Sequence, residues 1–519
     1  MIGGKIERIK DINIIPSPYL TGEMDEFFNY SLIPLVEATR GCPFSCTYCA
    51  DGLDIKNKVY RYNPQRVKDE LFYIAKKVKN TNDLMVADLN FGMYKQDLET
   101  AKAIASTQKK YNYPTVVSAS AGKNMPDRII DVANTMEGWL IEGAVQSTDP
   151  EVLKAVKRSN ISTLAYKKLI DFGNKKNTNV TYTDIILGLP RDSKKTHFES
   201  LRASLENNVK DIRVPQAILL PGTQMASKED RKKFGLKTKF RIPPGSSGKY
   251  EIFDEQHNAV ELEEIIVGSN TLSFEDYVEC RIMNLIIRTF YSNHIFIEVL
   301  TLLKTLDISI FDCLIYIKEH PDYYSKKIKE IIKSYVAATT DSLFATREEA
   351  NQYILSRKKI DKDIGEELGT NESITHLNLM LNEFDDVCEL MFQSVKDLIE
   401  QNKLLTNKIK NYLFDLKQFT LMRKRDFTNT KNIKSATFRY DFESISNNKF
   451  RIDPNSIEEL ENPLTFCFFH NDEQKKYISN AVQLYSKHSE GTEKIYSNQN
   501  INLMFRSFAR SQLDSPRTL

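Results

Sequence analysis

Short apolar runs alternate with amphipathic segments between about residues 34 and 225 of this chain. The apolar runs, rich in β-branched residues, cover 33–39, 83–90, 113–120, 138–147, 179–188 and 211–220. Segments whose apolar residues have helical spacing cover 64–79, 95–110, 126–136, 149–157, 163–176 and 195–208. Such alternation is typical of a parallel sheet with right-handed crossovers. It predicts an α/β fold, either an open doubly wound sheet or a partial barrel, with its chemistry at the carboxyl ends of the strands.

The pattern changes where prolines, glycines and serines crowd residues 243–248, which indicates a domain boundary. Beyond it, helical spacing covers 259–300, 305–337, 346–357 and 371–420, a strand pair is predicted over 436–445 and 463–470, and further helices over 471–488 and 498–511. We therefore expect four parts: a lead-in segment (1–33), an α/β domain (34–245), a helical domain (246–430) and a small α+β extension (431–519).

Composition narrows the class of protein. Lys and Arg number 72 against 70 Asp and Glu among 519 residues, a balance that does not favour a nucleic-acid partner. No apolar run reaches the roughly 18 residues that span a bilayer, and the first residues do not resemble a signal peptide. The seven cysteines are sparse and odd in number, so we expect reduced thiols, a cytoplasmic location and no membrane partner.

Three of the cysteines crowd one loop after the first predicted strand. Cys42, Cys46 and Cys49 have the spacing CxxxCxxC, which suits a soft metal centre. A structural zinc site needs a fourth ligand, but the next candidates along the chain are His197 and Cys280. A [4Fe–4S] cluster normally takes four cysteines, so three would leave one iron open to another ligand.

The stretch RGCPFSCTYC resembles the signature loop of the radical S-adenosylmethionine (radical SAM) superfamily. The resemblance implies a TIM-like partial (β/α)6 barrel followed here by a mainly helical region with a small late β element. It also implies one [4Fe–4S] cluster on Cys42, Cys46 and Cys49, with S-adenosylmethionine (SAM) on the open iron. An external donor of the flavodoxin or ferredoxin type would supply the electron that yields a 5′-deoxyadenosyl radical. Tyr48 stands where the family keeps an aromatic residue near the adenine.

The resemblance also implies SAM contacts at the end of the second strand. The family often has Gly-Gly-Glu here, facing the amino group of SAM. This chain departs from that form with DLNFGMY, which makes Asp88, Asn90 and Gly92 the candidates. A simpler interpretation makes Asp88 a helix N-cap.

Further candidates follow the fourth and fifth predicted strands. By resemblance, Gln146 and Ser147 face the ribose and carboxylate of SAM, and Arg158 pairs with the carboxylate. Leu187 and Gly188 match the stretch that contacts the adenine. In the simpler interpretation Arg158 is a surface residue and Gly188 a turn glycine. No residue is predicted as a catalytic acid or hydrogen-atom donor.

Residues 15–28 together with the cysteine loop are similar to the cobalamin-binding branch of the superfamily. That branch carries an N-terminal corrinoid domain, often with a D-x-H-x-x-G loop. We expect this chain to lack it, since only about thirty residues precede the core and no such motif is present. Three interpretations stay open: a relative that lost the domain, a protein that meets a corrinoid domain on a separate chain, or a truncated product. We favour the first.

The sequence leaves three alternative hypotheses for the function of this chain. The leading hypothesis is an enzyme whose radical abstracts hydrogen from a biosynthetic small molecule. The second is a radical methyltransferase that uses cobalamin from a separate corrinoid protein. The third is a non-catalytic zinc-loop module that binds a protein partner or RNA. Four scattered cysteines, Cys280, Cys313, Cys388 and Cys467, are expected to be structural thiols rather than a second cluster.

Overall fold

The computed structural model describes residues 8–122, 124–139, 143–175, 181–244, 246–253, 255–292, 294–358, 371–485, 495 and 501–511. The chain divides into two compact units. The first unit comprises residues 1–237 and 266–273, and the second comprises 238–265 and 274–519. The four predicted parts, with borders after residues 33, 245 and 430, stay a prediction.

Parallel strands form the centre of the first unit. Strands β1 (Leu35–Val36), β4 (Asp83–Phe91) and β5 (Val116–Ala121) form one parallel sheet, and β6 (Tyr182–Asp184) pairs in parallel with β7 (Asp211–Arg213). Isolated parallel bridges join Val117 to Trp139, Gln146 to Ile185 and Leu187 to Gln216. The α/β alternation predicted from the sequence is therefore present.

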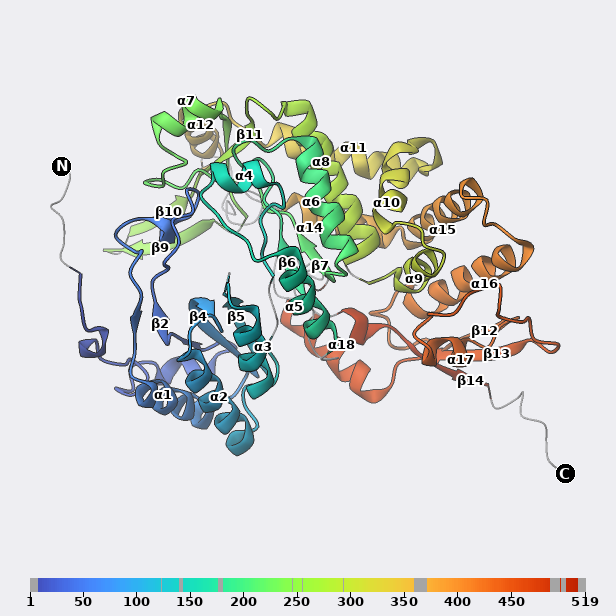
Figure 1. The fold of residues 1–519 in the computed structure, drawn as a ribbon, viewed down its shortest axis with the longest axis horizontal. Helices are drawn as coiled ribbons and strands as arrows, with labels where there is room; N and C mark the ends of the chain where they lie inside the picture. The colour runs from blue at the N-terminus through green and yellow to red at the C-terminus, as the bar shows by residue number, and fades with distance from the viewer. Residues whose placement is uncertain are drawn as a thin grey trace. The chain divides into compact units, whose positions relative to one another are not determined.

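Helices follow these strands. They are α1 (Pro64–Lys77), α2 (Asp97–Tyr111), α3 (Pro126–Thr135), α4 (Pro150–Ala155), α5 (Thr163–Lys175), α6 (Lys194–Glu206) and α7 (Lys228–Phe234). Figure 1 shows α1, α2 and α3 beside β4 and β5. Helix α1 begins where the Asn63 side chain accepts from the backbone N–H of Gln65, and Val67, Leu71 and Ile74 bury one face of it. Local capping and helical spacing therefore explain why its predicted start is right.

Several strands are shorter than predicted. The run 138–147 contributes only the bridges at Trp139 and Gln146. The predicted residues 140–142, 176, 179–180, 486–488 and 498–500 lie outside the described residues. Ladder pairing extends only two or three residues in β1, β6 and β7, because the neighbouring backbone leaves the sheet to form loops.

The second unit is mainly helical. Its helices are α8 (Phe274–Ile287), α9 (Ile297–Thr305), α10 (Ile310–Glu319), α11 (Lys326–Asp341), α12 (Arg347–Lys358), α14 (Glu372–Asn382), α15 (Phe384–Gln401), α16 (Asn407–Lys424), α17 (Phe442–Asn447) and α18 (Asp472–Tyr485). Strands β9 (Ser247–Ile252) and β10 (Glu255–Val260) pair in this unit. Strands β8 (Lys237–Arg241) and β11 (Glu263–Gly268) also pair, and residues 237 and 266–268 of these two strands are assigned to the first unit. The helical prediction for 259–300 is therefore wrong over β10 and β11, and the predicted boundary at 243–248 lies next to the β9–β10 hairpin.

The late β element has three strands. Strands β12 (Lys434–Phe438) and β13 (Leu464–Phe469) pair as predicted, and β14 (Ser507–Arg510) adds to β13. The strand predicted over 436–445 is wrong at its end, because residues 442–445 belong to helix α17. The predicted helix 498–511 is therefore wrong over its last residues. Phe508 of β14 packs edge-on against Phe419 with ring centroids 4.9 Å apart, so this ring contact favours the strand. Within the described residues, no helix is both long and apolar enough to cross a membrane.

Candidate functional site

The three cysteines lie on a tight loop between β2 (Thr39–Arg40) and β3 (Tyr60–Arg61). Gly41 has φ +97°, and a Cβ there would lie 2.1 Å from the carbonyl oxygen of Lys58. At Gly52 a Cβ would lie 2.5 Å from the carbonyl oxygen of Cys46. Backbone approaches as close as these require glycine. The loop is therefore held in one compact conformation around the cysteines.

The thiols fit an iron–sulfur cluster better than a single ion. None of the three is in a disulfide; Cys42 and Cys46 are buried and Cys49 is half-buried. In the part of the chain that the structure describes, no three His, Cys, Asp or Glu side chains are placed to hold one metal ion. A [4Fe–4S] cluster needs a wider arrangement, since each thiolate binds a different iron atom. The set of three soft sulfur donors on one loop therefore fits a cluster.

Asn90 lies against this loop. Its Nδ2 donates to Sγ of Cys42 at 3.4 Å, and its buried Oδ1 has no hydrogen-bond partner among the described residues. Hydrogen bonds to the sulfur ligands are one of the features that set the reduction potential of a cluster. The structure thus brings Asn90 to a cysteine, whereas the resemblance assigned it to the amino group of SAM.

Asp88 also contacts protein atoms. One carboxylate oxygen accepts from the backbone N–H groups of Ala38 and Thr39, at 2.8 and 3.0 Å. Burial raises the pKa of Asp88 to about 7, although these two amides lower it. Asp88 therefore fixes the backbone between β1 and the cysteine loop. It is not the N-cap of a helix.

Gly92 allows the chain to pack closely against Trp139 and Ile129. It has φ +83°, and a Cβ would lie 3.1 Å from the Trp139 ring and 3.2 Å from Cα of Ile129. Phe91 packs edge-on against the same indole, with ring centroids 5.1 Å apart. The close contact with a buried aromatic side chain accounts for a glycine at this position.

A cavity of about 190 Å³ lies next to the cysteine loop. Tyr48, Cys49, Gln146, Arg158 and Asn160 are among its lining residues. Small-molecule sites usually have roughly 300–1,000 Å³, so a ligand the size of SAM would extend beyond this cavity. The structure therefore brings four predicted site residues together around one cavity, and adds Asn160, which the sequence analysis missed.

Arg158 links the cysteine loop to the chain that follows Trp139. Its Nη1 donates to the hydroxyl of Tyr48 at 3.2 Å, its Nη2 to the carbonyl of Ala144, and its Nε to Oδ1 of Asn160 at 2.9 Å. Burial raises the pKa of the Tyr48 hydroxyl, so this tyrosine stays a neutral partner. Arg158 is buried, which excludes the surface interpretation.

Asn160 completes this link. Its Nδ2 donates to the carbonyls of Val145 and Ser147, at 2.9 Å each. Gln146 between them has φ +64°, a conformation that non-glycine residues rarely adopt. Arg158 and Asn160 therefore hold the backbone of a strained turn that lines the cavity.

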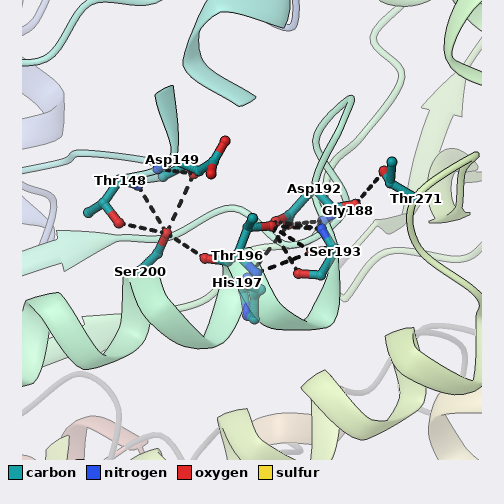
Figure 2. A network of polar contacts seen from close by, with 10 residues as sticks. Thr148, Asp149, Gly188, Asp192, Ser193, Thr196, His197, Ser200 and Thr271 are labelled. Carbon is teal, nitrogen blue, oxygen red and sulfur yellow. Dashed lines mark hydrogen bonds and ion pairs between the residues drawn. The ribbon is translucent and has the colours of Figure 1, made fainter. Parts of the chain in front are cut away.

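Ser147 directly follows the cavity-lining Gln146, and neither it nor Leu187 and Gly188 is among the residues that line the cavity. Figure 2 shows a polar network at the start of α6 that includes Gly188, Asp192 and Ser200. The Ser147 hydroxyl accepts from the backbone N–H of Asp149 at 3.2 Å and lies 3.5 Å from the Ser200 hydroxyl. Leu187 is fully buried. These contacts fit turns and packing, and their assignment to SAM stays a prediction.

Asp192 organises that network. Its carboxylate accepts from the N–H groups of Ser193 and Gly188, at 3.0 and 3.3 Å, and from the Thr196 hydroxyl at 2.8 Å. Burial raises the pKa of Asp192 to about 7. Asp192 was not among the residues predicted from the sequence. The signal that could have indicated it was its position after Gly188-Leu-Pro and just before the capping box at the start of α6.

Comparisons with known proteins cover the segment that carries the cysteine loop. Residues 36–203 match the family model described as the Radical SAM superfamily. This segment of the chain is thus similar to the radical SAM superfamily, and it contains Cys42, Cys46 and Cys49. The non-catalytic zinc-loop hypothesis is set aside, since the match covers the cysteine loop.

Two curated relatives are methyltransferases. The chain is 32% identical over 249 residues to the cobalamin-dependent radical SAM methyltransferase TokK of Streptomyces tokunonensis, covering 46% of this chain and 36% of that protein. It is 30% identical over 296 residues to the 2-(S-pantetheinyl)-carbapenam-3-carboxylate methyltransferase of Streptantibioticus cattleyicolor, covering 54% and 41%. The matched part thus spans about two fifths of the length of these relatives.

Among solved structures, the cobalamin-dependent SAM radical enzyme OxsB matches at 12% identity and a TM-score of 0.37, covering 78% of this chain and 60% of that one. The radical SAM methyltransferase TsrM of Kitasatospora setae matches at 14% identity and a TM-score of 0.36, covering 44% and 43%.

Proposed function

We propose that this enzyme cleaves SAM reductively and that the resulting 5′-deoxyadenosyl radical abstracts hydrogen from a small molecule in a biosynthetic pathway. The observation that carries the proposal is the position of three thiols, none of them in a disulfide, on one short loop, with Cys49 lining a cavity. When bound, the cluster supplies the electron for cleavage of SAM. An electron donor of the flavodoxin or ferredoxin type completes the proposal.

The protein side chains position and insulate this chemistry. Asn90 donates to a cysteine sulfur, Asp88 holds the start of the loop, and Arg158 holds Tyr48 beside Cys49. Cys42 and Cys46 are buried, so the chain itself keeps water from two of the three sulfur ligands. These contacts support a cluster site whose ligands are fixed before SAM binds.

A second candidate is methyl transfer with cobalamin on a separate corrinoid protein. Both curated relatives are methyltransferases, and one of them is described as cobalamin-dependent. The two candidates share the reductive cleavage of SAM and differ in the fate of a second SAM molecule. Plain hydrogen abstraction needs no corrinoid, whereas methyl transfer needs it and forms S-adenosylhomocysteine.

Anaerobic reconstitution with iron and sulfide tests the shared step. We expect a brown protein that forms 5′-deoxyadenosine from SAM when dithionite is added. Replacement of Cys42, Cys46 and Cys49 by Ala should abolish both the colour and the product. Cys467→Ala is the matched control, since Cys467 is a free, half-buried thiol on β13. Zinc in place of iron, or cleavage that survives the triple replacement, would refute the proposal.

Addition of a corrinoid protein separates the two candidates. S-adenosylhomocysteine that forms only when hydroxocobalamin or a corrinoid protein is present would favour methyl transfer. Formation of 5′-deoxyadenosine with no response to corrinoid would favour hydrogen abstraction alone.

A further inference from the structure

The second unit contains a cavity of about 310 Å³ that is unrelated to the cysteine loop. It is lined by residues from the end of α14, the start of α15, the end of α16 with the turn that follows, Ile295 and Phe505. This volume falls within the range of small-molecule sites. The cavity therefore has room for a compact ligand.

The inner wall is aromatic. Phe384, Phe427 and Phe505 line the cavity and are buried. Phe427 and Phe505 meet edge-on, with ring centroids 5.4 Å apart. Nζ of Lys424 lies 5.0 Å from the centroid of the Phe505 ring. A flat apolar group would pack against these rings with an ammonium at its edge.

Positive charge exceeds negative charge in the protein beside this wall. Lys424 and Arg506 are both almost fully buried. Glu298, also buried, accepts from Lys424 at 2.5 Å and from Arg423 at 3.2 Å. Arg506 donates to backbone carbonyls of Met422, Arg425, Asp426 and Asn429. Among the described contacts, the buried carboxylate of Glu298 pairs with Lys424 and Arg423, whereas Arg506 interacts electrostatically with the exposed Asp426.

One N–H of Lys424 is weakly engaged. Its ammonium donates to Ile295 and Glu298 at 2.7 and 2.5 Å, but its contact with the carbonyl of His294 is 3.4 Å long. A hydrogen-bond acceptor in the cavity would make a stronger contact than this one. Burial lowers the pKa of Lys424 to about 8, and the neighbouring Arg423 adds to the effect. A bound anion would offset the excess positive charge.

The outer wall is polar. Asn382, Asn429 and Asp426 line the cavity and are exposed. The two amide side chains offer N–H donors to an anionic ligand, whereas Asp426 repels it. Because Asp426 is exposed, water screens its charge more than the charges of the buried cations.

We propose that this cavity binds a small carboxylate with an aromatic body, the ring against Phe427 and Phe505 and the carboxylate toward Lys424. This site goes beyond the proposed function and does not depend on the cluster or on SAM. Its failure would leave the radical chemistry untouched.

Three probes with the same ring test the charge preference: phenylacetate, benzamide and benzylamine. Binding to the full chain is measured by ligand-observed NMR and calorimetry at low salt. We expect phenylacetate to bind about tenfold more tightly than benzylamine, with benzamide between them, because the ammonium meets an excess of buried cations. Equal affinity for the three probes, or none for phenylacetate, would overturn the proposal.

Two exposed positions supply variants that leave the core intact. Asn382→Trp should block the outer wall and remove binding, whereas Asn351→Trp, at an exposed position of α12, is the matched control and should bind as the parent does. Asp426→Asn should tighten phenylacetate binding about twofold to fivefold, since a repelling charge is removed. Its φ of +49° also suits asparagine. Unchanged binding in Asn382→Trp would refute the location.

Discussion

The contacts of Arg158 make a quantitative prediction. In Arg158→Lys the positive charge stays, but one ammonium replaces three separate donor positions that reach Tyr48, Ala144 and Asn160. A hydrogen bond to a charged group contributes about 1.5–3 kcal/mol, and neighbouring contacts are not additive. Loss of two of the three should lower the free energy of unfolding of the first unit by about 3 kcal/mol.

The chain has a built-in probe for this unit. Trp139 is its one tryptophan, and its indole is buried in the core of the first unit. Indole emission during urea unfolding of the metal-free protein therefore reports this unit and not the second. With a typical urea dependence, 3 kcal/mol corresponds to a midpoint lowered by about 1 M or more.

The matched control is Arg202→Lys. Arg202 lies on α6 of the same unit and makes a 3.8 Å ion pair with Glu199, a partly exposed contact that contributes about 0.5 kcal/mol. Anaerobic SAM binding to both variants separates two roles of Arg158. An unchanged midpoint with lost SAM affinity would refute the positioning role and support the direct contact with the SAM carboxylate that the resemblance implied.

Three further predictions follow from single contacts near the cysteine loop. Asn90→Ala removes the N–H donor to Cys42, so the reduction potential of the reconstituted cluster should fall. A redox titration followed by electron paramagnetic resonance measures this potential, and an unchanged value would contradict the contact. Burial raises the pKa of Asp88 in the folded protein to about 7, from about 3.9 in the unfolded chain. The contribution of Asp88 to the free energy of unfolding is therefore complete below pH 4 and is lost as the pH rises through 7. Asp88→Asn should remove about 4 kcal/mol of this pH dependence from the unfolding of the first unit, and a pH profile identical to that of the parent would contradict the assignment. Gly41→Ala should prevent iron retention, because the added Cβ would lie 2.1 Å from a carbonyl oxygen. The control Gly222→Ala has φ +83° and no atom within 4 Å of its Cβ, so it should lower the free energy of unfolding by only about 1 kcal/mol and keep the iron. Loss of iron in both variants would show that backbone strain, and not the close contact at Gly41, decides iron retention.

The sequence was most informative where one short segment determines its own structure. The motif around Cys42, Cys46 and Cys49 predicted the superfamily whose model matches residues 36–203, and these three cysteines stay its predicted cluster ligands. Helices such as α1 were predictable because capping and apolar spacing are local properties.

What the sequence could not supply depends on contacts between distant segments. Asn90 meets a cysteine 48 residues earlier, and Arg158 meets Tyr48 across 110 residues, so neither contact has a local signal. Strand β14 was not predicted for the same reason, because it forms against β13 and the ring of Phe419, which are distant in the sequence. A family resemblance suggests that such residues face the site without specifying which atoms they contact.

The unequal burial of the three thiols has a consequence for loading and damage of the protein. Cys49 is the half-buried member, while Cys42 and Cys46 are enclosed by the loop. Reagents that reach the folded, metal-free chain from solvent, whether iron, oxygen or an alkylating compound, therefore encounter Cys49 first. Air exposure would disable the loop by modifying this one sulfur while the other two are still intact.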